Sequence, residues 1–274
     1  MDNTTKFAFE NIPVPERQKK PRDRGLTMMI DWGLPLGLQK DCLEAQGIYV
    51  DEAKIAGSIP RIMPSDYLRR KIEAYREEEV FAFPGGLFTE LAIAQGNYES
   101  FLQEAKEAGF SGIEVSDNLL QIDPKQKKAI ISKAVNEYGI AVMGEVGRKE
   151  GSMSGQELIT DVENCLEAGA SLVLIEAHEL FHGDIRVDVL EDLTKRVPID
   201  KLMFELPVAV LPDVTKTYKT KVLFWMISQF GTDVNLANVE WDEIYFTEIT
   251  RLGASGETSH PQGAYRLAGM DAVE

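Results

Sequence analysis

Carboxylates recur through this 274-residue chain, each just after a short apolar run. Carboxylates held a few ångströms apart raise one another's pKa or bind a cation, and all-oxygen ligands favour Mg2+ or Mn2+. If the runs are strands whose ends meet, the sequence predicts an Mg2+ or Mn2+ site, although any single carboxylate could instead pair with a neighbouring Lys or Arg. The expected metal ligands are Asp31, Glu114, Asp117, Glu145, Glu176 and Glu205, with Glu90 and Glu179 as further acids of the same region.

Groups that could bind an anion stand at the ends of other runs. Lys54 follows the second run, and Arg148 and Lys149 follow the fifth. Gly85 and Gly86 offer close backbone approach and amides that could hold an anion, or they form only a tight turn. Two candidates for phosphate binding come late in the chain, Asn235-Leu236-Ala237-Asn238 and Gly253-Ala254-Ser255-Gly256, and the second could instead cap the last helix.

The segments that must position these residues repeat inside the sequence. Residues 106–117 parallel residues 166–176, and residues 136–145 show the pattern a third time. Each copy is typical of a helix end, a glycine cap and a buried strand that ends in a carboxylate. Strands are expected to end near Asp31, Lys54, Pro84, Asp117, Glu145, Glu176, Glu205 and Asn235, with helices at about 36–46, 65–78, 97–108, 124–138, 155–168, 185–196, 213–230 and 241–251.

Eight strand–helix units in about 250 residues predict an α/β fold, a single-domain (β/α)8 TIM barrel. The main competitor is a doubly wound open sheet, but no Gly-x-Gly-x-x-Gly follows the first strand and no Walker-type loop is present. We expect the barrel over residues 25–258, after a polar, basic arm over 1–24 and before a tail over 259–274. In a barrel the strand ends meet at one mouth, which is where active sites form.

Composition excludes several classes of protein. The chain has 29 Lys and Arg against 45 Asp and Glu, a net charge of −16, which argues against nucleic-acid and anionic-membrane binding. No apolar stretch is long enough to span a membrane and no secretory signal is recognisable, so a cytoplasmic protein is predicted. Cys42 and Cys165 support neither a disulfide framework nor a zinc site. We expect the basic cluster at Arg17, Lys19, Lys20, Arg22 and Arg24 to be solvated, with a specific anion-binding role as the alternative.

One stretch matches a zinc-peptidase motif. His178-Glu179-Leu180-Phe181-His182 has the spacing H-E-x-x-H, which binds zinc when both histidines lie on one face of a helix. Here the motif follows a predicted strand, Leu172 to Ile175, so it falls at a strand end and loop, and a zinc peptidase is not favoured. His178 could still contact a metal or substrate at the mouth, or it is an ordinary polar loop residue.

The order of the motifs resembles that of the phosphosulfolactate synthase family, which includes the first enzymes of one coenzyme M pathway and bacterial and plant stress-associated relatives. The resemblance spans about residues 22–258. It rests on Asp31-Trp32-Gly33-Leu34-Pro35, Lys54, Phe83-Pro84-Gly85-Gly86, Glu114-Val115-Ser116-Asp117, Glu145-Val146-Gly147-Arg148-Lys149, Glu176-Ala177-His178-Glu179, Phe204-Glu205-Leu206-Pro207 and Asn235-Leu236-Ala237-Asn238-Val239.

The resemblance implies a homo-oligomer, a trimer by analogy with the family, and an Mg2+-dependent lyase that adds sulfite to phosphoenolpyruvate. Attack on the methylene carbon forms an enolate-like dianion, which a carboxylate-held metal would stabilise. By this resemblance Lys149 is the general acid, and Lys54 and Arg148 hold the carboxylate and phosphate of a small anionic substrate. The other expected site residues are His178, as a catalytic residue, and Trp32, Gly85, Gly86, Ser116, Asn235 and Asn238, as substrate-binding residues.

The chain departs from the family pattern where cations are expected. Trp32 replaces a lysine, His178 replaces an arginine, and Ser255 stands where the family has another arginine; Ser58-Ile59-Pro60 replaces Trp-Gly-Thr. Each lost buried charged contact is worth on the order of 2–5 kcal/mol, so an altered acceptor or nucleophile is predicted. Trp32 would wall the cleft or pack in the core. The alternatives are a metal-dependent lyase or isomerase acting on a less anionic carboxylate, and a non-catalytic stress or scaffold protein.

Overall fold

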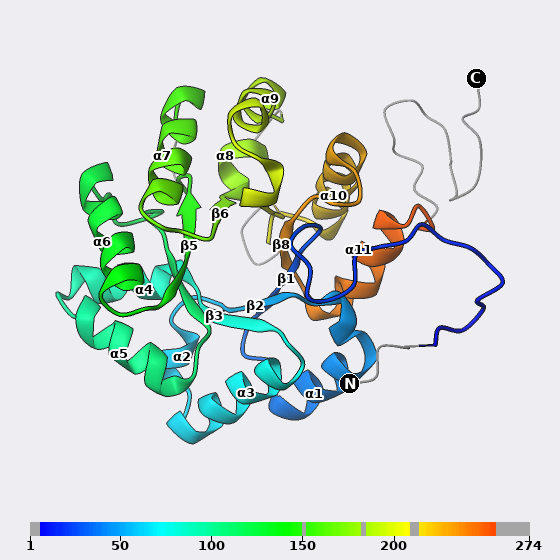
Figure 1. Ribbon diagram of the computed structural model, residues 1–274, viewed down its shortest axis with the longest axis horizontal. Coiled ribbons are helices and arrows are strands. Elements are labelled where there is room, and N and C mark those ends of the chain that lie inside the picture. Colours follow the sequence, from blue (N-terminus) through cyan, green and yellow to red (C-terminus); the bar gives the residue numbers. More distant parts are fainter. Residues whose placement is uncertain (1–5, 150–151, 182–184, 209–213, 256–274) are drawn as a thin grey trace.

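The computed structural model describes residues 6–149, 152–181, 185–208 and 214–255, and eight parallel strands form its centre (Figure 1). The strand order is β3-β2-β1-β8-β7-β6-β5-β4, and Ser111 N–H donates to Ala82 O at 2.8 Å across the seam between β3 and β4. The predicted (β/α)8 barrel is therefore confirmed. The strands are β1 (Thr27–Asp31), β2 (Glu52–Ile55), β3 (Phe81–Pro84), β4 (Gly112–Val115), β5 (Ala141–Val146), β6 (Leu172–Ile175), β7 (Leu202–Glu205) and β8 (Leu236–Val239).

Helices alternate with the strands and form the outer layer (Figure 1). Local sequence explains several of their ends: Asp123 caps the first turn that begins at Pro124, Ser154 and Glu157 form a capping box, and Gly109 ends a helix at φ 94°. The α-helices are α1 (Leu36–Gln46), α2 (Ile59–Ile62), α3 (Ser65–Glu77), α4 (Gly86–Ala94), α5 (Tyr98–Ala108), α6 (Pro124–Asn136), α7 (Gly155–Glu167), α8 (Ala177–Phe181), α9 (Val187–Arg196), α10 (Lys216–Phe230) and α11 (Ile244–Arg251), with 3-10 turns η1 (Gly47–Tyr49), η2 (Ile199–Lys201) and η3 (Trp241–Glu243).

Side chains alternate between the two faces of each strand, so one apolar core lies inside the barrel and another lies around it. Met28, Phe83, Met143, Leu174 and Met203 belong to the core inside the barrel. A larger core lies between the strands and the helices, and it takes the neighbours of these residues, such as Met29 on β1. Most strands are consequently apolar on both faces, and their last residues decide which polar groups point into the mouth; β2 is the exception, because Glu52 and Lys54 both lie on its inward face.

The eighth strand lies four residues later than predicted. The sequence places its end at Asn235, but β8 starts at Leu236 and ends at Val239. Asn235 lies at the N-terminal end of the barrel, where its side chain accepts from Leu26 N–H and donates to Leu202 O, both at 2.9 Å. The expected position of Asn235 at the mouth was therefore wrong, because the apolar run continues through Leu236 and Ala237 after this one polar residue.

The basic arm closes the N-terminal end of the barrel. Arg17 pairs with Glu248 at 2.9 Å, Arg22 pairs with Asp51 at 3.0 Å, and Lys20 donates to Gly47 O at 3.2 Å. The Arg17 and Arg22 side chains are only 8% and 3% exposed. The expectation of a solvated cluster was wrong for these residues.

Among the helices of the described ranges, none is long and apolar enough to cross a membrane.

Candidate active site

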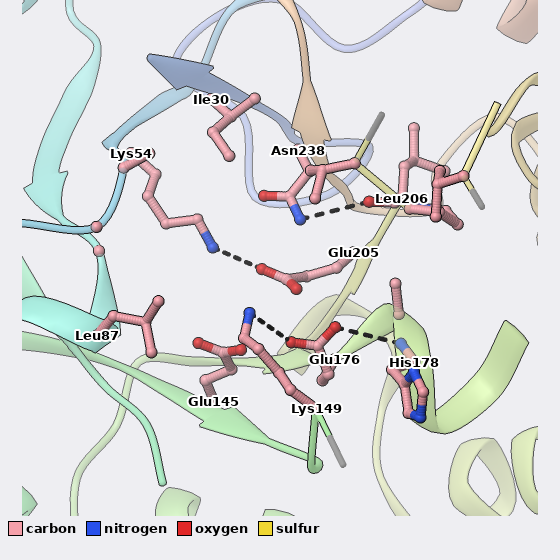
Figure 2. Close-up of a pocket in the computed structure, with 18 of the residues that line it drawn as sticks. Ile30, Lys54, Leu87, Glu145, Lys149, Glu176, His178, Glu205, Leu206 and Asn238 are labelled. Atoms are coloured by element: carbon pink, nitrogen blue, oxygen red, sulfur yellow. Dashed lines mark hydrogen bonds and ion pairs between the residues drawn. The ribbon is translucent and has the colours of Figure 1, made fainter. Parts of the chain in front are cut away.

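A pocket of about 330 Å3 opens at the C-terminal ends of the strands. Figure 2 shows its charged residues converging from β2, β5, β6 and β7, with the side chains of Leu87 and Leu206 at its sides. The size is typical of small-molecule sites. Its lining includes Ile30, Trp32, Lys54, Gly85, Gly86, Leu87, Glu114, Glu145, Lys149, Glu176, His178, Phe181, Glu205, Leu206, Pro207, Val208, Val214, Tyr218 and Asn238.

Lys54 holds two carboxylates together on the floor of the pocket. Its Nζ lies 2.5 Å from Glu205 Oε1 and 3.2 Å from Glu114 Oε1. Burial alone would lower the pKa of Lys54, but Glu114, Glu205 and Glu145 together raise it well above its usual value. Lys54 is therefore charged at neutral pH, and it is already paired before any substrate arrives.

Glu145 completes a group of three buried carboxylates. One oxygen each of Glu114, Glu145 and Glu205 lie within 4.8 Å of one another. Asn118 Nδ2 donates to Glu145 Oε1 at 2.5 Å and so orients that carboxylate. Burial, and then the neighbouring charges of Glu114 and Glu205, raise the pKa of Glu145 well above its usual value. A divalent cation at this point would relieve that repulsion.

Lys149 and Glu176 form a second ion pair at the pocket wall. Lys149 Nζ lies 3.0 Å from Glu176 Oε2, and the backbone N–H of His178 donates to the other Glu176 oxygen at 3.2 Å (Figure 2). The carboxylates of Glu176, Glu145 and Glu205 outweigh burial and raise the pKa of Lys149, which keeps it protonated. Gly147 allows this turn, because it has φ 127° and a Cβ there would lie 2.7 Å from Glu176 Cβ.

The pocket has an excess of negative charge. Among its described lining residues, four carboxylates face two ammonium groups, which leaves two negative charges when every carboxyl is ionised. The negative charge is carried by carboxylate oxygens, which are the hard ligands that Mg2+ and Mn2+ prefer. The residues present therefore fit one divalent cation.

Two of the predicted metal ligands point away from the pocket. Asp31 extends from β1 toward α3, where Lys71 Nζ lies 2.5 Å from its carboxylate and Tyr75 O–H donates at 2.7 Å. Asp117 pairs with the buried Lys127 of α6 at 2.7 Å. Neither belongs to the carboxylate group of Glu114, Glu145 and Glu205, because each pairs with a buried lysine between the strands and the helices.

The predicted anion-binding residues are scattered. Arg148 is exposed and lines a separate depression with Asp117, so the structure does not bring it to the pocket. Ser116 is fully buried and donates to Glu90. Ala254 N–H bonds back to Ile249 O at 2.8 Å, so the stretch through Ser255 caps α11; Gly256 lies outside the described residues.

The amides of Gly85 and Gly86 are already used. Gly85 N–H donates to Ile55 O at 2.9 Å, and Gly86 N–H donates to Glu114 Oε2 at 2.5 Å. Both glycines line the pocket. The sequence left open whether they bind an anion or only form a tight turn, and the structure shows a tightly packed turn. A Cβ on Gly86 would lie 2.7 Å from Ser116 Cβ. The Gly86 amide therefore positions Glu114, the Gly85 amide joins the ends of β2 and β3, and both have a partner within the protein.

Trp32, His178 and Asn238 do line the pocket. Trp32 is 44% exposed at its rim, so it walls the cleft and is not a core residue. Asn238 has φ 60°, which Asn tolerates, and its Nδ2 donates to Leu206 O at 3.4 Å. Asn238 Oδ1 is buried with no hydrogen-bond partner among the described residues. That acceptor is available to a ligand.

The H-E-x-x-H stretch does not form a zinc site in the described residues. Glu179 is buried and accepts from Arg148 N–H and Met153 N–H at 3.0 Å, and Arg186 pairs with it at 3.1 Å. Its carboxylate thus holds the loop after β5. The motif begins in the five-residue helix α8, and His182 lies outside the described residues.

Several supporting residues were missed by sequence reasoning. Asn118 contacts Glu145 and also Glu176, at 3.4 Å. Glu90 accepts from Asn118, Leu119 and Leu120 N–H groups and shapes the loop after β4. Glu90 was expected among the acids of this region, whereas Asn118 was missed because its contacts are remote in sequence. Phe181 and Tyr218 come from helices, where apolar spacing resembles ordinary core packing.

Comparison with known structures supports the fold. A phosphonopyruvate hydrolase aligns with a TM-score of 0.51 at 16% identity, over 88% of this chain and 86% of that one. The 3-hexulose-6-phosphate synthase of Salmonella typhimurium aligns with a TM-score of 0.50 at 13% identity, over 82% of this chain and 99% of that one. At such identities the likeness shows the barrel alone.

Comparison with sequences is more specific. Phosphosulfolactate synthase of Methanothermobacter thermautotrophicus is 33% identical over 92% of this chain and 97% of its own length, and that of Bacillus subtilis is 29% identical over 90% and 97%. The Arabidopsis thaliana protein HEAT-STRESS-ASSOCIATED 32 is 26% identical over 81% and 84%. The family model for (2R)-phospho-3-sulfolactate synthase matches residues 15–257. The chain therefore belongs to the phosphosulfolactate synthase family, a family of lyase-type enzymes.

Proposed function

We propose that this protein is an Mg2+-dependent lyase of phosphosulfolactate synthase type, which adds sulfite or another nucleophile to phosphoenolpyruvate or a related enol carboxylate. The observation that carries the proposal is the juxtaposition of the Glu114, Glu145 and Glu205 carboxylates with a charged lysine, Lys149, in one pocket. The relatives named above support the reaction class. Assembly as a homo-oligomer, by analogy a trimer, and a cytoplasmic location stay predictions.

Glu114, Glu145 and Glu205 would hold the metal. Their oxygens lie close enough together, and the two excess negative charges of the pocket match one divalent ion. Bound there, Mg2+ would supply electrostatic stabilisation of the carboxylate and enolate oxygens of the substrate. Mn2+ has the same ligand preferences and would substitute for Mg2+.

Lys149 would supply the proton. Addition of sulfite to the methylene carbon of the acceptor forms a carbon–sulfur bond and moves the electron pair of the double bond onto the neighbouring carbon and its carboxylate. That carbon must then receive a proton, and Lys149 holds one at Nζ on the pocket wall. Glu176 orients this ammonium group, and Gly147 permits the turn that brings it there.

Lys54 would hold the carboxylates of the metal site in place. Because its Nζ is bonded to both Glu114 and Glu205, it fixes the spacing of two of the three carboxylates. Its positive charge also makes the floor of the pocket less negative, which reduces the repulsion of an incoming anion. The second candidate is a lyase or isomerase acting on a less anionic carboxylate, and the observation that favours it is the position of Arg148 outside the pocket.

The experiment is to incubate the protein with Mg2+, phosphoenolpyruvate and sulfite and to search for a phosphorylated sulfonate by mass spectrometry. We expect a product whose mass equals that of both substrates plus the protons taken up, and we expect its loss in Lys149→Ala. No product at high enzyme concentration would reject sulfite addition to phosphoenolpyruvate and leave the second candidate.

A further inference from the structure

Residues 7–14 hold large apolar side chains in water. We define the apolar loop as Phe7, Phe9, Ile12 and Val14, whose exposed fractions are 53%, 86%, 69% and 48%. A turn orders this stretch, since Ile12 N–H donates to Phe9 O at 2.8 Å. Figure 1 shows it in blue as part of a loop that stands away from the helices beside α11. Apolar side chains gathered in this way mark a surface that binds another molecule.

The chain that follows the apolar loop is fixed to the body beside α11. Arg17 pairs with Glu248 of α11 at 2.9 Å and donates to Thr232 O at 3.0 Å. Both side chains of the ion pair are buried. A loop that is anchored at one end and ordered by a turn of its own loses less conformational entropy when it binds a partner than a free chain end would lose.

A second apolar surface lies along α11. We define the apolar stripe as Trp241 of η3 with Tyr245 and Ile249 of α11, which follow one another at four-residue spacing and so share one side of the helix. They are 40%, 51% and 39% exposed. Ile48 of η1, itself 39% exposed, extends the stripe, because the neighbouring Tyr49 contacts Tyr245 edge to face with ring centroids 6.0 Å apart.

Charge favours contact between the apolar loop and the apolar stripe. Residues 1–24 have six Lys and Arg against four Asp and Glu, so the rest of the chain carries a net charge of −18. Lys6 and Lys19 are exposed on either side of the apolar loop. The three acids of 240–243, around Trp241, share two lysine partners among the described residues, which leaves one negative charge beside the stripe. Opposite charges around an apolar contact steer association.

We infer that this side of the molecule is an interface between copies of this chain, in which the apolar loop of one copy packs on the apolar stripe of the next. Within one chain the two surfaces stay apart, because Phe9 and Tyr245 remain largely exposed although Arg17 fixes the loop beside the same helix. A head-to-tail contact of this kind can close into a ring of identical subunits. The inference goes beyond the proposed function, since neither surface lines the pocket.

The first test is the mass of the full chain in solution, measured by analytical ultracentrifugation over a range of protein concentration. We expect the wild type to form an oligomer, and we expect Phe9→Glu and Ile249→Glu each to raise its dissociation constant by at least about tenfold, because each places a charge in an apolar contact. The matched control is Ile62→Glu, which changes an 82% exposed isoleucine of α2 outside both surfaces and should leave the mass unchanged. Circular dichroism checks that each variant is folded.

The second test shows which surfaces meet. Cys42 and Cys165 are buried, so a short bismaleimide should react with the double variant Ile12→Cys/Ile249→Cys at the new thiols and link separate chains, whereas each single variant should stay unlinked. A link within one chain would show that the loop covers its own stripe and would overturn the inference. A wild type that is monomeric at every concentration, an oligomer that survives both glutamate variants, or dissociation by Ile62→Glu would overturn it as well.

Discussion

Two groups of carboxylates at the strand ends of this barrel look alike in sequence and differ in surroundings. Glu114, Glu145 and Glu205 point into the barrel, where Lys54 on the floor pairs with only two of them, Glu114 and Glu205. Asp31 and Asp117 lie on the helix side of the sheet, and each has a buried lysine partner. The inward group is deficient in positive charge and so suits a metal, whereas each outward acid is bonded directly to a buried lysine and serves stability.

The outward pairs also show how the fold supports the mouth. Lys127 binds Asp117 at 2.7 Å and Asp161 at 2.8 Å, and it donates to the backbone carbonyl of Glu145 at 2.7 Å. It thereby ties the end of β5 to helices α6 and α7. A carboxylate at a strand end thus binds ligand or braces the strand, depending on which face of the sheet it occupies.

The largest expected effect concerns the proton donor. Lys149→Ala should lower turnover by about 10²- to 10⁴-fold, because no other ammonium of the described pocket lies free to replace it. Single-turnover kinetics with mass detection of product measures this. Lys128→Ala is the matched control, since Lys128 forms a surface pair with Glu167. Undiminished turnover in Lys149→Ala would remove this residue as the acid.

The next effect separates stability from metal binding. Asp31→Asn leaves the fully buried Lys71 without its carboxylate partner and should reduce the free energy of unfolding by about 3–5 kcal/mol. Urea unfolding measures this change, and Asp66→Asn on the exposed face of α3 should leave it nearly unaltered. Mg2+ affinity should be unchanged in Asp31→Asn at temperatures where the variant is folded. Lost metal affinity there would contradict the division between inward and outward acids.

A third effect, of similar size, is a pH dependence of stability from Glu52. Burial raises the pKa of this carboxyl from 4.5 to about 8, and its Oε2 has no hydrogen-bond partner among the described residues. The folded state therefore keeps a proton that the unfolded state releases, so stability falls as pH rises from about 4.5 to about 8. Glu52→Gln should remove this loss of stability. Each unit by which the pKa is raised corresponds to about 1.4 kcal/mol of unfolding free energy.

Calorimetry at two pH values measures the Glu52 effect. The melting temperature of Glu52→Gln should exceed that of the wild type by roughly 5–10 °C at pH 8.5, and the difference should nearly vanish at pH 5. A difference that is equal at both pH values would show that Glu52 is not the group that titrates. An advantage for the wild type at pH 8.5 would show that its ionised form is stabilised by the fold.

The sequence predicted the barrel because eight apolar runs and their glycine caps are local features. It could not show which face each terminal acid occupies, since strands of a parallel barrel are apolar on both faces and the period of two is hidden. Asp31 follows Met28, Met29 and Ile30, so nothing in the run marks it as outward. Its partner Lys71 stands on α3, forty residues away, and only the folded chain reveals that contact.

The end of β8 escaped prediction for a related reason. Asn235 interrupts the apolar run and resembles a strand end, but its side chain satisfies backbone groups of β1 and β7 at the N-terminal end of the barrel. Asn238, three residues later, is the one that lines the pocket. A polar residue inside a buried strand is ambiguous until its hydrogen-bond partners are known.

The central claim is that the inward carboxylates, and not the outward ones, hold a divalent cation. Titration with Mn2+ followed by electron paramagnetic resonance measures the bound ion directly. We predict one Mn2+ per chain in the wild type and in Asp117→Asn, at least a tenfold weaker affinity in Glu145→Gln, and displacement of Mn2+ by Mg2+. Binding that survives unchanged in Glu145→Gln, or that disappears in Asp117→Asn, would contradict the claim.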